Sequence, residues 1–190
     1  MTTATTHGAT YRIHLGALPD APRRARRFIT SLMAQWGLAS ERETVETLEL
    51  LISEVTTNAV RATGRDSGPV DALSGETIPT IEVRARATDR TPTTTEVVVE
   101  VWDNSPDTSP VPPADAADDA EGGRGLFLIG ALAHAWGCTE ETLPPMDTPG
   151  KTVWFALLVE RAIILPALPP KDATPPAICL PRRPTNHATT

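Results

Sequence analysis

Apolar residues recur at steps of three and four along two early segments of the chain, the spacing that predicts amphipathic helices. The first segment covers residues 19–36, and the second covers residues 40–63. In the second segment, Ser40 followed by Glu43 matches a capping box at a helix start. The apolar stripe of this second helix consists of Val45, Leu48, Ile52, Val55, Ala59 and Ala62. We therefore expect two helices in the first third of the chain.

Alternating apolar and polar residues predict strands in the rest of the chain. We expect these strands at residues 10–15, 80–87, 95–102 and 151–160. Residues 122–137 begin with glycines and continue as a helix whose apolar stripe ends at Trp136, and a loop follows at 138–150. Because adjacent strands and adjacent helices occur in separate blocks, this order predicts an α+β fold. We expect a two-layer α/β sandwich with a mixed, mostly antiparallel sheet and helices on one face.

Length and composition favour one folded domain with appendages. Hydrophobic residues make up 40% of the 190 residues, which is enough to bury a core. We assign residues 10–160 to this domain and residues 1–9 to a flexible N-terminus. The proline-rich tail at 161–190 is expected to be extended or disordered. The stretch 103–122 is long for an internal loop, and loops of this length are usually lids or disordered segments.

The net charge of the chain argues against a nucleic-acid-binding protein. The charge is -7 at pH 7, whereas duplex binding depends on Lys and Arg side chains that neutralise phosphates. The basic cluster at 22–28 fits a solvated helix face better than a phosphate track. The two cysteines are far apart, the start does not resemble a leader, and no stretch reaches membrane-spanning length. We therefore expect a cytoplasmic protein without membrane contact.

Polar side chains occupy one narrow sector of the second predicted helix. Glu54, Asn58 and Arg61 fall together at about 100° per residue, away from the middle of the apolar stripe. Taken alone, this sector fits a solvated face better than the wall of a pocket. Two observations favour a pocket. Leu50 and Leu51 flank the sector, and carboxylate and amide oxygens suit Mg²⁺.

Two further motifs contain candidate ligand-binding residues. Asp103 directly follows an apolar strand, which places its carboxylate either at a pocket rim or in a plain Asp-Asn turn. The glycines of "EGGRGL" allow the backbone to approach a ligand, and the helix that follows offers N–H groups to phosphates. Within this motif, Arg124 would add a cationic contact. The later motif "PGKTVW" is not a P-loop, because Pro145 stands where the first glycine is required.

The order of these motifs is more specific than any one of them. Glu54-x-x-x-Asn58, then Asp103 after a strand, then "GGRGL" and then "GKTVWF" resemble the N, G1, G2 and final boxes of the histidine-kinase-like ATPase superfamily, the Bergerat fold. The likeness is to its small bacterial members related to anti-sigma-factor serine kinases. In that group "SELVTNAVRHG" is similar to "SEVTTNAVRAT" here. The resemblance covers roughly residues 10–160.

The resemblance implies a role for each matching residue. Asn58 would hold Mg²⁺, and Glu54 would be the base that activates a hydroxyl group or water. Asp103 would accept a hydrogen bond from the adenine amino group of ATP, with Thr152 nearby and Arg61 also at the nucleotide. The residues that would close over the phosphates are Gly123, Arg124, Gly125 and Leu126. The loop at 103–122 would then be an ATP lid.

The chain also departs from the family pattern. The G1 box reads "DNSPD", whereas relatives that bind nucleotide fully have Asp-x-Gly-x-Gly, and Ala62 stands where a histidine is often found. The insertion at 64–80 and the tail lie outside the family core.

The resemblance implies an ATP- and Mg²⁺-binding regulatory kinase. It would bind a sigma factor or its antagonist and phosphorylate the antagonist on Ser or Thr. Two alternatives stay open, namely a non-catalytic, nucleotide-gated binding module and a degenerate scaffold that binds no nucleotide. The resemblance also allows a homodimer.

Overall fold

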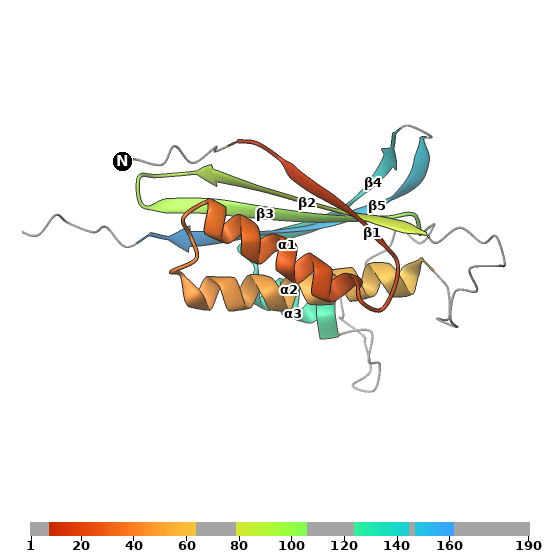
Figure 1. Cartoon of the computed structure of the whole chain (residues 1–190), viewed down its shortest axis with the longest axis horizontal. Helices are drawn as coiled ribbons and strands as arrows, with labels where there is room; N and C mark the ends of the chain where they lie inside the picture. Colours follow the sequence, from red (N-terminus) through yellow and green to blue (C-terminus); the bar gives the residue numbers. More distant parts are fainter. Residues whose placement is uncertain (1–7, 64–78, 106–123, 145–146, 162–190) are drawn as a thin grey trace, which may run out of the picture.

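The described residues form two layers, a sheet and the helices that cover one of its faces (Figure 1). This computed structural model describes residues 8–63, 79–105, 124–144 and 147–161. The elements in chain order are β1 (Tyr11–Gly16), α1 (Ala21–Gln35), α2 (Arg42–Ala62), β2 (Thr80–Asp89), β3 (Thr94–Asp103), α3 (Arg124–Leu132), β4 (Ala135–Leu143) and β5 (Thr148–Glu160). The predicted α+β fold is confirmed. Of the helices in these ranges, none is long and apolar enough to cross a membrane.

The strands follow the order β1-β2-β3-β5-β4 across the sheet. Every neighbouring pair of the described strands is antiparallel, in agreement with the mostly antiparallel sheet that the sequence predicts. Asp103 at the end of β3 pairs with Lys151 near the start of β5. This register brings the end of β3 and the start of β5 together at one end of the sheet.

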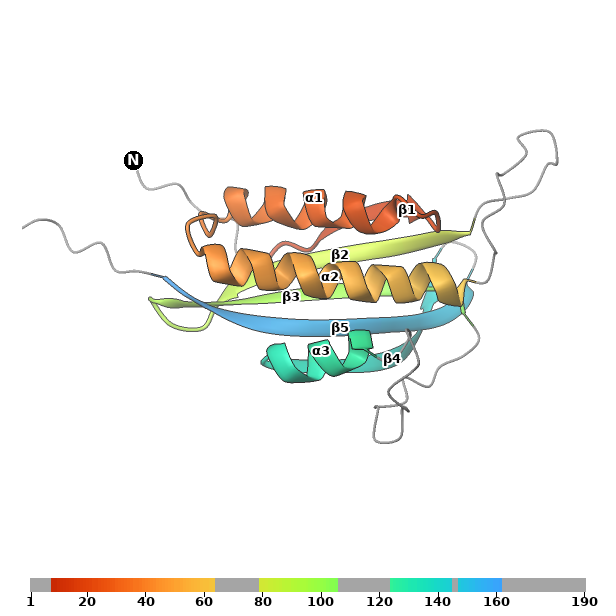
Figure 2. The ribbon, with the colours of Figure 1, turned by 90° about the horizontal axis from the view of Figure 1, so that it is seen from below.

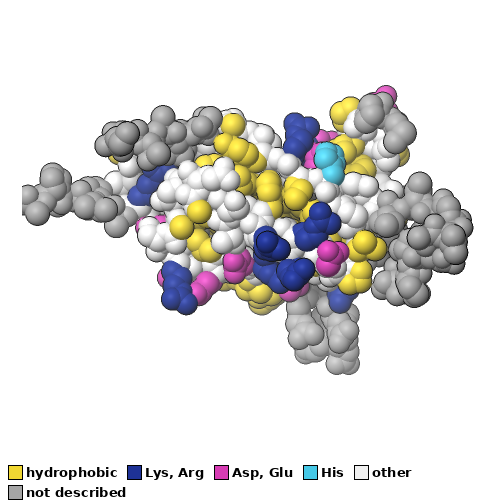
Figure 3. All heavy atoms as spheres, viewed as in Figure 1, with side chains coloured by type: hydrophobic (Ala, Val, Ile, Leu, Met, Phe, Trp, Pro, Cys, Tyr) yellow, Lys and Arg dark blue, Asp and Glu magenta, His cyan; other side chains and the backbone are white. Residues whose placement is uncertain are grey.

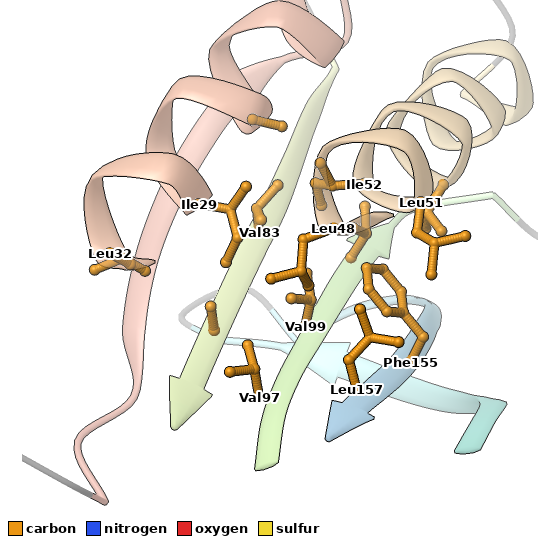
Figure 4. Close-up of a cluster of buried hydrophobic side chains, with 14 of the residues drawn as sticks. Ile29, Leu32, Leu48, Leu51, Ile52, Val83, Val97, Val99, Phe155 and Leu157 are labelled. Atoms are coloured by element: carbon orange, nitrogen blue, oxygen red, sulfur yellow. The ribbon is translucent and has the colours of Figure 1, made fainter. Parts of the chain in front are cut away.

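The core lies between the helices and one face of the sheet. Alternate residues of the central strands are apolar, so one face of each strand can be buried. Val99 of β3 pairs with Phe155 of β5, and both side chains are fully buried. Leu48 and Leu51 of α2 lie next to this pair on the helix side, as Figure 4 shows. Removal of this apolar surface from water is the main stabilising contribution to such a fold.

Helix α1 turns its arginines away from the core. Arg23, Arg24 and Arg27 are exposed, and Lys and Arg side chains gather over α1 in Figure 3. Arg26 is half-buried and donates to Ser53 Oγ of α2 at 2.8 Å, which links the two helices. Most of the basic cluster is therefore a solvated helix face, as predicted.

The sequence prediction for the region after α3 is wrong. The pattern predicts a helix through residue 137 and then a loop, but α3 ends at Leu132 and residues Ala135–Leu143 form the edge strand β4. Trp136 lies in this strand and pairs with Phe155 of β5. These residues form a strand because they pair with β5. This pairing outweighs the weak local conformational preference of "AWGCTEETL".

The predicted capping box at the start of α2 is also absent. The helix begins at Arg42, Glu41 is the N-cap residue, and no side chain caps the helix. Ser40 Oγ donates instead to Glu41 Oε1 at 3.3 Å. Because Ser40 precedes the N-cap position, its hydroxyl group cannot accept from the first-turn N–H groups as a capping box requires.

Candidate functional site

The N-terminus of α3 lies against two polar side chains of α2. A Cβ atom added to Gly125 would lie 3.0 Å from Asn58 Nδ2 and 3.0 Å from Glu54 Oε2. Glycine lets the backbone of α3 come this close, because any side chain would have to displace both groups. The structure thus brings together three residues that the sequence predicts for one site, Glu54, Asn58 and Gly125.

Helix geometry explains why Glu54 and Asn58 face the same neighbour. They are one turn apart on α2, so their side chains lie side by side. Both are half-buried, whereas Val55 and Ala59 next to them are buried in the core. The first turn of α3 has N–H groups without partners inside the helix and a positive dipole end. A carboxylate, an amide and a helix N-terminus are groups that can bind a polyphosphate with its metal ion.

The donor atoms of this contact fit Mg²⁺ that also binds phosphate. Mg²⁺ prefers oxygen ligands and is usually bound by one or two protein groups, with waters and substrate phosphates completing its shell. The amide oxygen of Asn58 is such a ligand. In the described ranges, no group of three or more His, Cys, Asp and Glu residues is arranged to hold a metal ion. Asn58 is thus a residue that could hold Mg²⁺ together with a phosphate ligand.

Asp103 is a buried carboxylate with two hydrogen-bond donors beside it. It is only 2% exposed. Its Oδ1 accepts from the N–H of Ser105 at 2.9 Å and lies 3.2 Å from Nζ of Lys151. Burial raises the pKa of Asp103 above its usual value, while the Ser105 N–H and the Lys151 ammonium act in the opposite direction. The carboxylate can therefore serve as an acceptor inside a largely dry region.

Asp103 lies on the face of the sheet that the helices cover. It is in phase with Val99 and Val101 of β3, which are fully buried on that face. Helix α2 contacts both β3 and β5. In Figure 2 the end of β3, the start of β5 and the end of α2 lie at the same end of the molecule. Asp103 and the Glu54–Asn58 pair therefore belong to one end of the domain.

The chain approaches itself closely where β5 passes the end of β3. A Cβ atom added to Gly150 would lie 2.2 Å from the carbonyl oxygen of Asp103 and 2.7 Å from the ring of Trp102. No side chain fits at this distance. Gly150 therefore permits the register that places Lys151 opposite Asp103. This gives the glycine of "GKTVWF" a structural function.

Thr152 does not lie beside Asp103, and this part of the sequence prediction is wrong. Thr152 pairs with Trp102, so its side chain is one residue out of phase with Asp103 and lies on the opposite face of the sheet. There its Oγ1 donates to Glu141 Oε2 at 2.5 Å and accepts from Arg84 at 3.1 Å. Lys151 takes the position that the sequence analysis assigns to Thr152.

The face that carries Thr152 is held together by ion pairs. Nε of Arg84 lies 3.1 Å from Oε2 of Glu100, and Nη2 of Arg84 lies 2.5 Å from Oε2 of Glu141. The Arg84 hydrogen bond lowers the pKa of Glu141 to about 2. These side chains line a groove of about 500 Å³. Because its charged groups already pair with one another, we assign this network to the stability of the sheet.

The other predicted residues are placed as follows. Arg61 is exposed in the last turn of α2. Leu126 is half-buried and packs against the core. Arg124 is the first residue of α3. Gly123 and nearly all of the predicted lid at 103–122 lie outside the described residues.

Two residues near Asp103, Lys151 and Cys138, are not among those that the sequence predicts for the site. The signal for Lys151 is the alternation of β5, because the buried Phe155 and the half-buried Val153 predict that Lys151 faces the helices too. Cys138 pairs with Val153 and so lies on the same face. Burial raises the pKa of the Cys138 thiol. No signal pointed to Cys138, because its strand was not recognised.

Comparison with known proteins identifies the family of the domain. A family model described as a histidine kinase-like ATPase domain matches residues 15–155, which is more than half of the 190 residues. The matched range includes Glu54, Asn58, Asp103 and Gly125. A search of curated proteins found no match. The resemblance seen in the sequence is thus confirmed, and the chain belongs to the histidine kinase-like ATPase domain family.

Proposed function

We propose that this chain is a regulatory protein that binds ATP and Mg²⁺ and phosphorylates a protein antagonist on serine or threonine. Membership of an ATPase domain family implies ATP binding. The observation that carries the proposal is the contact of Gly125 with Glu54 and Asn58. It supports a phosphate site because a metal-binding amide, a candidate base and a helix N-terminus meet there.

Glu54 acts as the general base in this proposal. The hydroxyl oxygen of the acceptor forms a bond to the γ-phosphorus of ATP, and the bond from that phosphorus to the β–γ bridging oxygen breaks. The hydroxyl proton passes to the Glu54 carboxylate, and ADP leaves. Bound Mg²⁺ would neutralise charge on the phosphate oxygens. Asn58 positions the phosphates, and the N-terminus of α3 stabilises their negative charge.

Asp103 binds the nucleobase in this proposal. Its carboxylate accepts a hydrogen bond from the exocyclic amino group of adenine. Two observations support this role. Asp103 is buried on the helix-covered face, and it lies at the same end of the sheet as the end of α2. A buried hydrogen-bonding group discriminates strongly, because a ligand without the matching group leaves it unpaired.

The binding partner in this proposal is a sigma factor or its antagonist, and the antagonist is the phosphate acceptor. Family membership supports a protein kinase of this kind without naming the partner. The net charge of -7 favours a protein partner over nucleic acid. A homodimer stays a prediction.

Transfer of radiolabelled phosphate from [γ-³²P]ATP to candidate antagonist proteins tests the proposal. Glu54→Gln should lower the rate at least about a hundredfold, because it removes the base but keeps the shape of the side chain. Glu43→Gln is the matched control, since Glu43 is an exposed residue in the first turn of the same helix. Transfer that survives Glu54→Gln unchanged would remove the assigned base.

ATP binding measured in parallel separates the remaining functions. A protein that binds ATP·Mg but transfers no phosphate to any candidate is a nucleotide-gated binding module. A protein that binds no ATP·Mg at millimolar concentration is a scaffold, and the proposed function is then wrong.

A further inference from the structure

Lys151 lies beside the carboxylate that the proposed function assigns to the nucleobase. Its Nζ is 3.2 Å from Asp103 Oδ1, and the side chains of Lys151 and Asp103 are 11% and 2% exposed. The N–H of Ser105 donates to the same oxygen at 2.9 Å. Within the part of the chain that the structure describes, both contacts to this carboxylate are made to Oδ1. Oδ2 is therefore the oxygen that can accept from a ligand.

Lys151 has more donors than its contact with Asp103 uses. An ammonium group carries three N–H donors and no acceptor. In a side chain this buried, the remaining donors need a partner, because an unmet buried donor costs free energy. The pair therefore presents an acceptor, Oδ2 of Asp103, next to a donor, Nζ of Lys151.

This order of acceptor and donor complements one edge of adenine. The exocyclic amino group of adenine donates, and the adjacent ring nitrogen N1 accepts. We propose that Lys151 is a specificity residue that donates to N1 of adenine while Asp103 accepts from the amino group. This inference rests on the proposed function, because it requires a nucleotide at this site. The Lys151 charge also offsets the cost of keeping a carboxylate buried beside a neutral base.

Guanine mismatches the same pair of side chains. In the same pose its carbonyl oxygen O6 replaces the amino group and faces the Asp103 carboxylate, so two acceptors oppose each other. Its N1 carries a hydrogen and faces the Lys151 ammonium, so two donors oppose each other. The pair therefore selects ATP over GTP through two contacts rather than one.

Calorimetric titration with nucleotide analogues tests the role of Lys151. The ligands are the Mg²⁺ complexes of ATP, of GTP, of 1-deaza-ATP, in which a C–H group replaces N1, and of 7-deaza-ATP. Wild-type protein should bind 1-deaza-ATP about ten- to a hundredfold more weakly than ATP, because a charge-assisted hydrogen bond is lost. It should bind 7-deaza-ATP as it binds ATP, since N7 lies on the other ring.

Two variants test whether Lys151 causes the weaker binding of 1-deaza-ATP relative to ATP, which we call the N1 penalty. Lys151→Met keeps an aliphatic stem but has no donor, so it should bind ATP and 1-deaza-ATP equally, as a double-mutant cycle requires. Lys151→Gln keeps a neutral donor for Asp103 and guards against loss of folding in the first variant. Its N1 penalty should be smaller than in wild type, because neutral hydrogen bonds are weaker.

The outcomes separate this inference from the proposed function. Wild-type protein that binds ATP and 1-deaza-ATP equally, or variants that keep the full N1 penalty, would overturn the role of Lys151 and leave ATP binding intact. Wild-type protein that prefers GTP would also overturn it. Wild-type protein that binds none of the nucleotides would overturn the proposed function itself.

Discussion

Replacement of Gly125 by alanine places one methyl group between α3 and the Glu54–Asn58 pair. The new Cβ atom would lie 3.0 Å from Asn58 Nδ2, 3.0 Å from Glu54 Oε2 and 3.3 Å from Glu54 Cβ. Comfortable contacts to carbon lie at about 3.5–4.0 Å. The side chains of Glu54 and Asn58, or the first turn of α3, must therefore move by several tenths of an ångström.

Gly125→Ala should cost little stability and should also weaken nucleotide binding. Overpacking costs about 1–3 kcal/mol, while alanine is favoured over glycine within a helix by about 1 kcal/mol. The net loss of unfolding free energy should therefore be about 0–2 kcal/mol. The displaced groups are the ones that we assign to Mg²⁺ and phosphate. In active sites, a positioning error of about 1 Å can lower the reaction rate about a hundredfold. We expect Gly125→Ala to weaken ATP·Mg binding at least about tenfold.

Gly130→Ala is the matched control for this prediction. Gly130 also lies in α3, and a Cβ atom there would lie 3.6 Å from Trp136 Nε1, which is an ordinary contact. This variant should bind ATP·Mg as wild type does and should be neutral or slightly more stable. Calorimetry gives the affinities, and urea unfolding gives the stabilities. If Gly125→Ala binds ATP·Mg as tightly as Gly130→Ala, the contact of α3 with the Glu54–Asn58 pair is not part of the site.

Three further predictions address the sheet and its ligand-facing end. Gly150→Ala should lower the urea-unfolding free energy by about 3 kcal/mol or more, because the new Cβ would lie 2.2 Å from the Asp103 carbonyl oxygen; a loss below about 1 kcal/mol would refute this close contact. Glu141→Gln should cost about 1–2 kcal/mol at pH 7 after allowance for solvent screening of a side chain that is 33% exposed. Because Arg84 lowers the pKa of Glu141 from 4.5 to about 2, this difference from wild type should shrink as the pH falls from 4.5 towards 2, and a constant difference would contradict it. ATP·Mg should slow the alkylation of Cys138 by iodoacetamide in a variant that lacks the other cysteine. Mass spectrometry after a timed reaction measures this labelling, and labelling that ATP·Mg leaves unchanged would mean that the ligand binds elsewhere.

Elements with strong periodicity were predictable from the sequence because periodicity reports burial on one face. Helix α2 and strands β3 and β5 each carry an uninterrupted apolar face, and each was expected close to its observed position. Strand β4 was not predictable because none of its residues is fully buried and its polar residues do not alternate cleanly with apolar ones. Its conformation depends on pairing with β5, and such pairing lies outside any local pattern.

The residues of the candidate site could be predicted from the sequence better than their arrangement in space. The order of the motifs indicated that Glu54, Asn58 and Gly125 belong together, and the structure places them in contact. The assignment of Thr152 failed because a strand reverses the side-chain direction at every residue, so an error of one position exchanges Thr152 for Lys151. The motif alone does not state which of the two faces Asp103.

Calorimetric titration of ATP with and without Mg²⁺, on wild type and Asn58→Ala, tests the central claim of a nucleotide site most directly. We expect wild type to bind ATP, to bind it more tightly with Mg²⁺, and to lose that gain when Asn58 is replaced, because we propose its amide oxygen as the protein ligand of the metal. Asn58→Ala should still bind ATP without Mg²⁺ as wild type does. Equal gains from Mg²⁺ in both proteins would contradict the metal assignment, and no ATP binding by wild type would contradict the nucleotide site altogether.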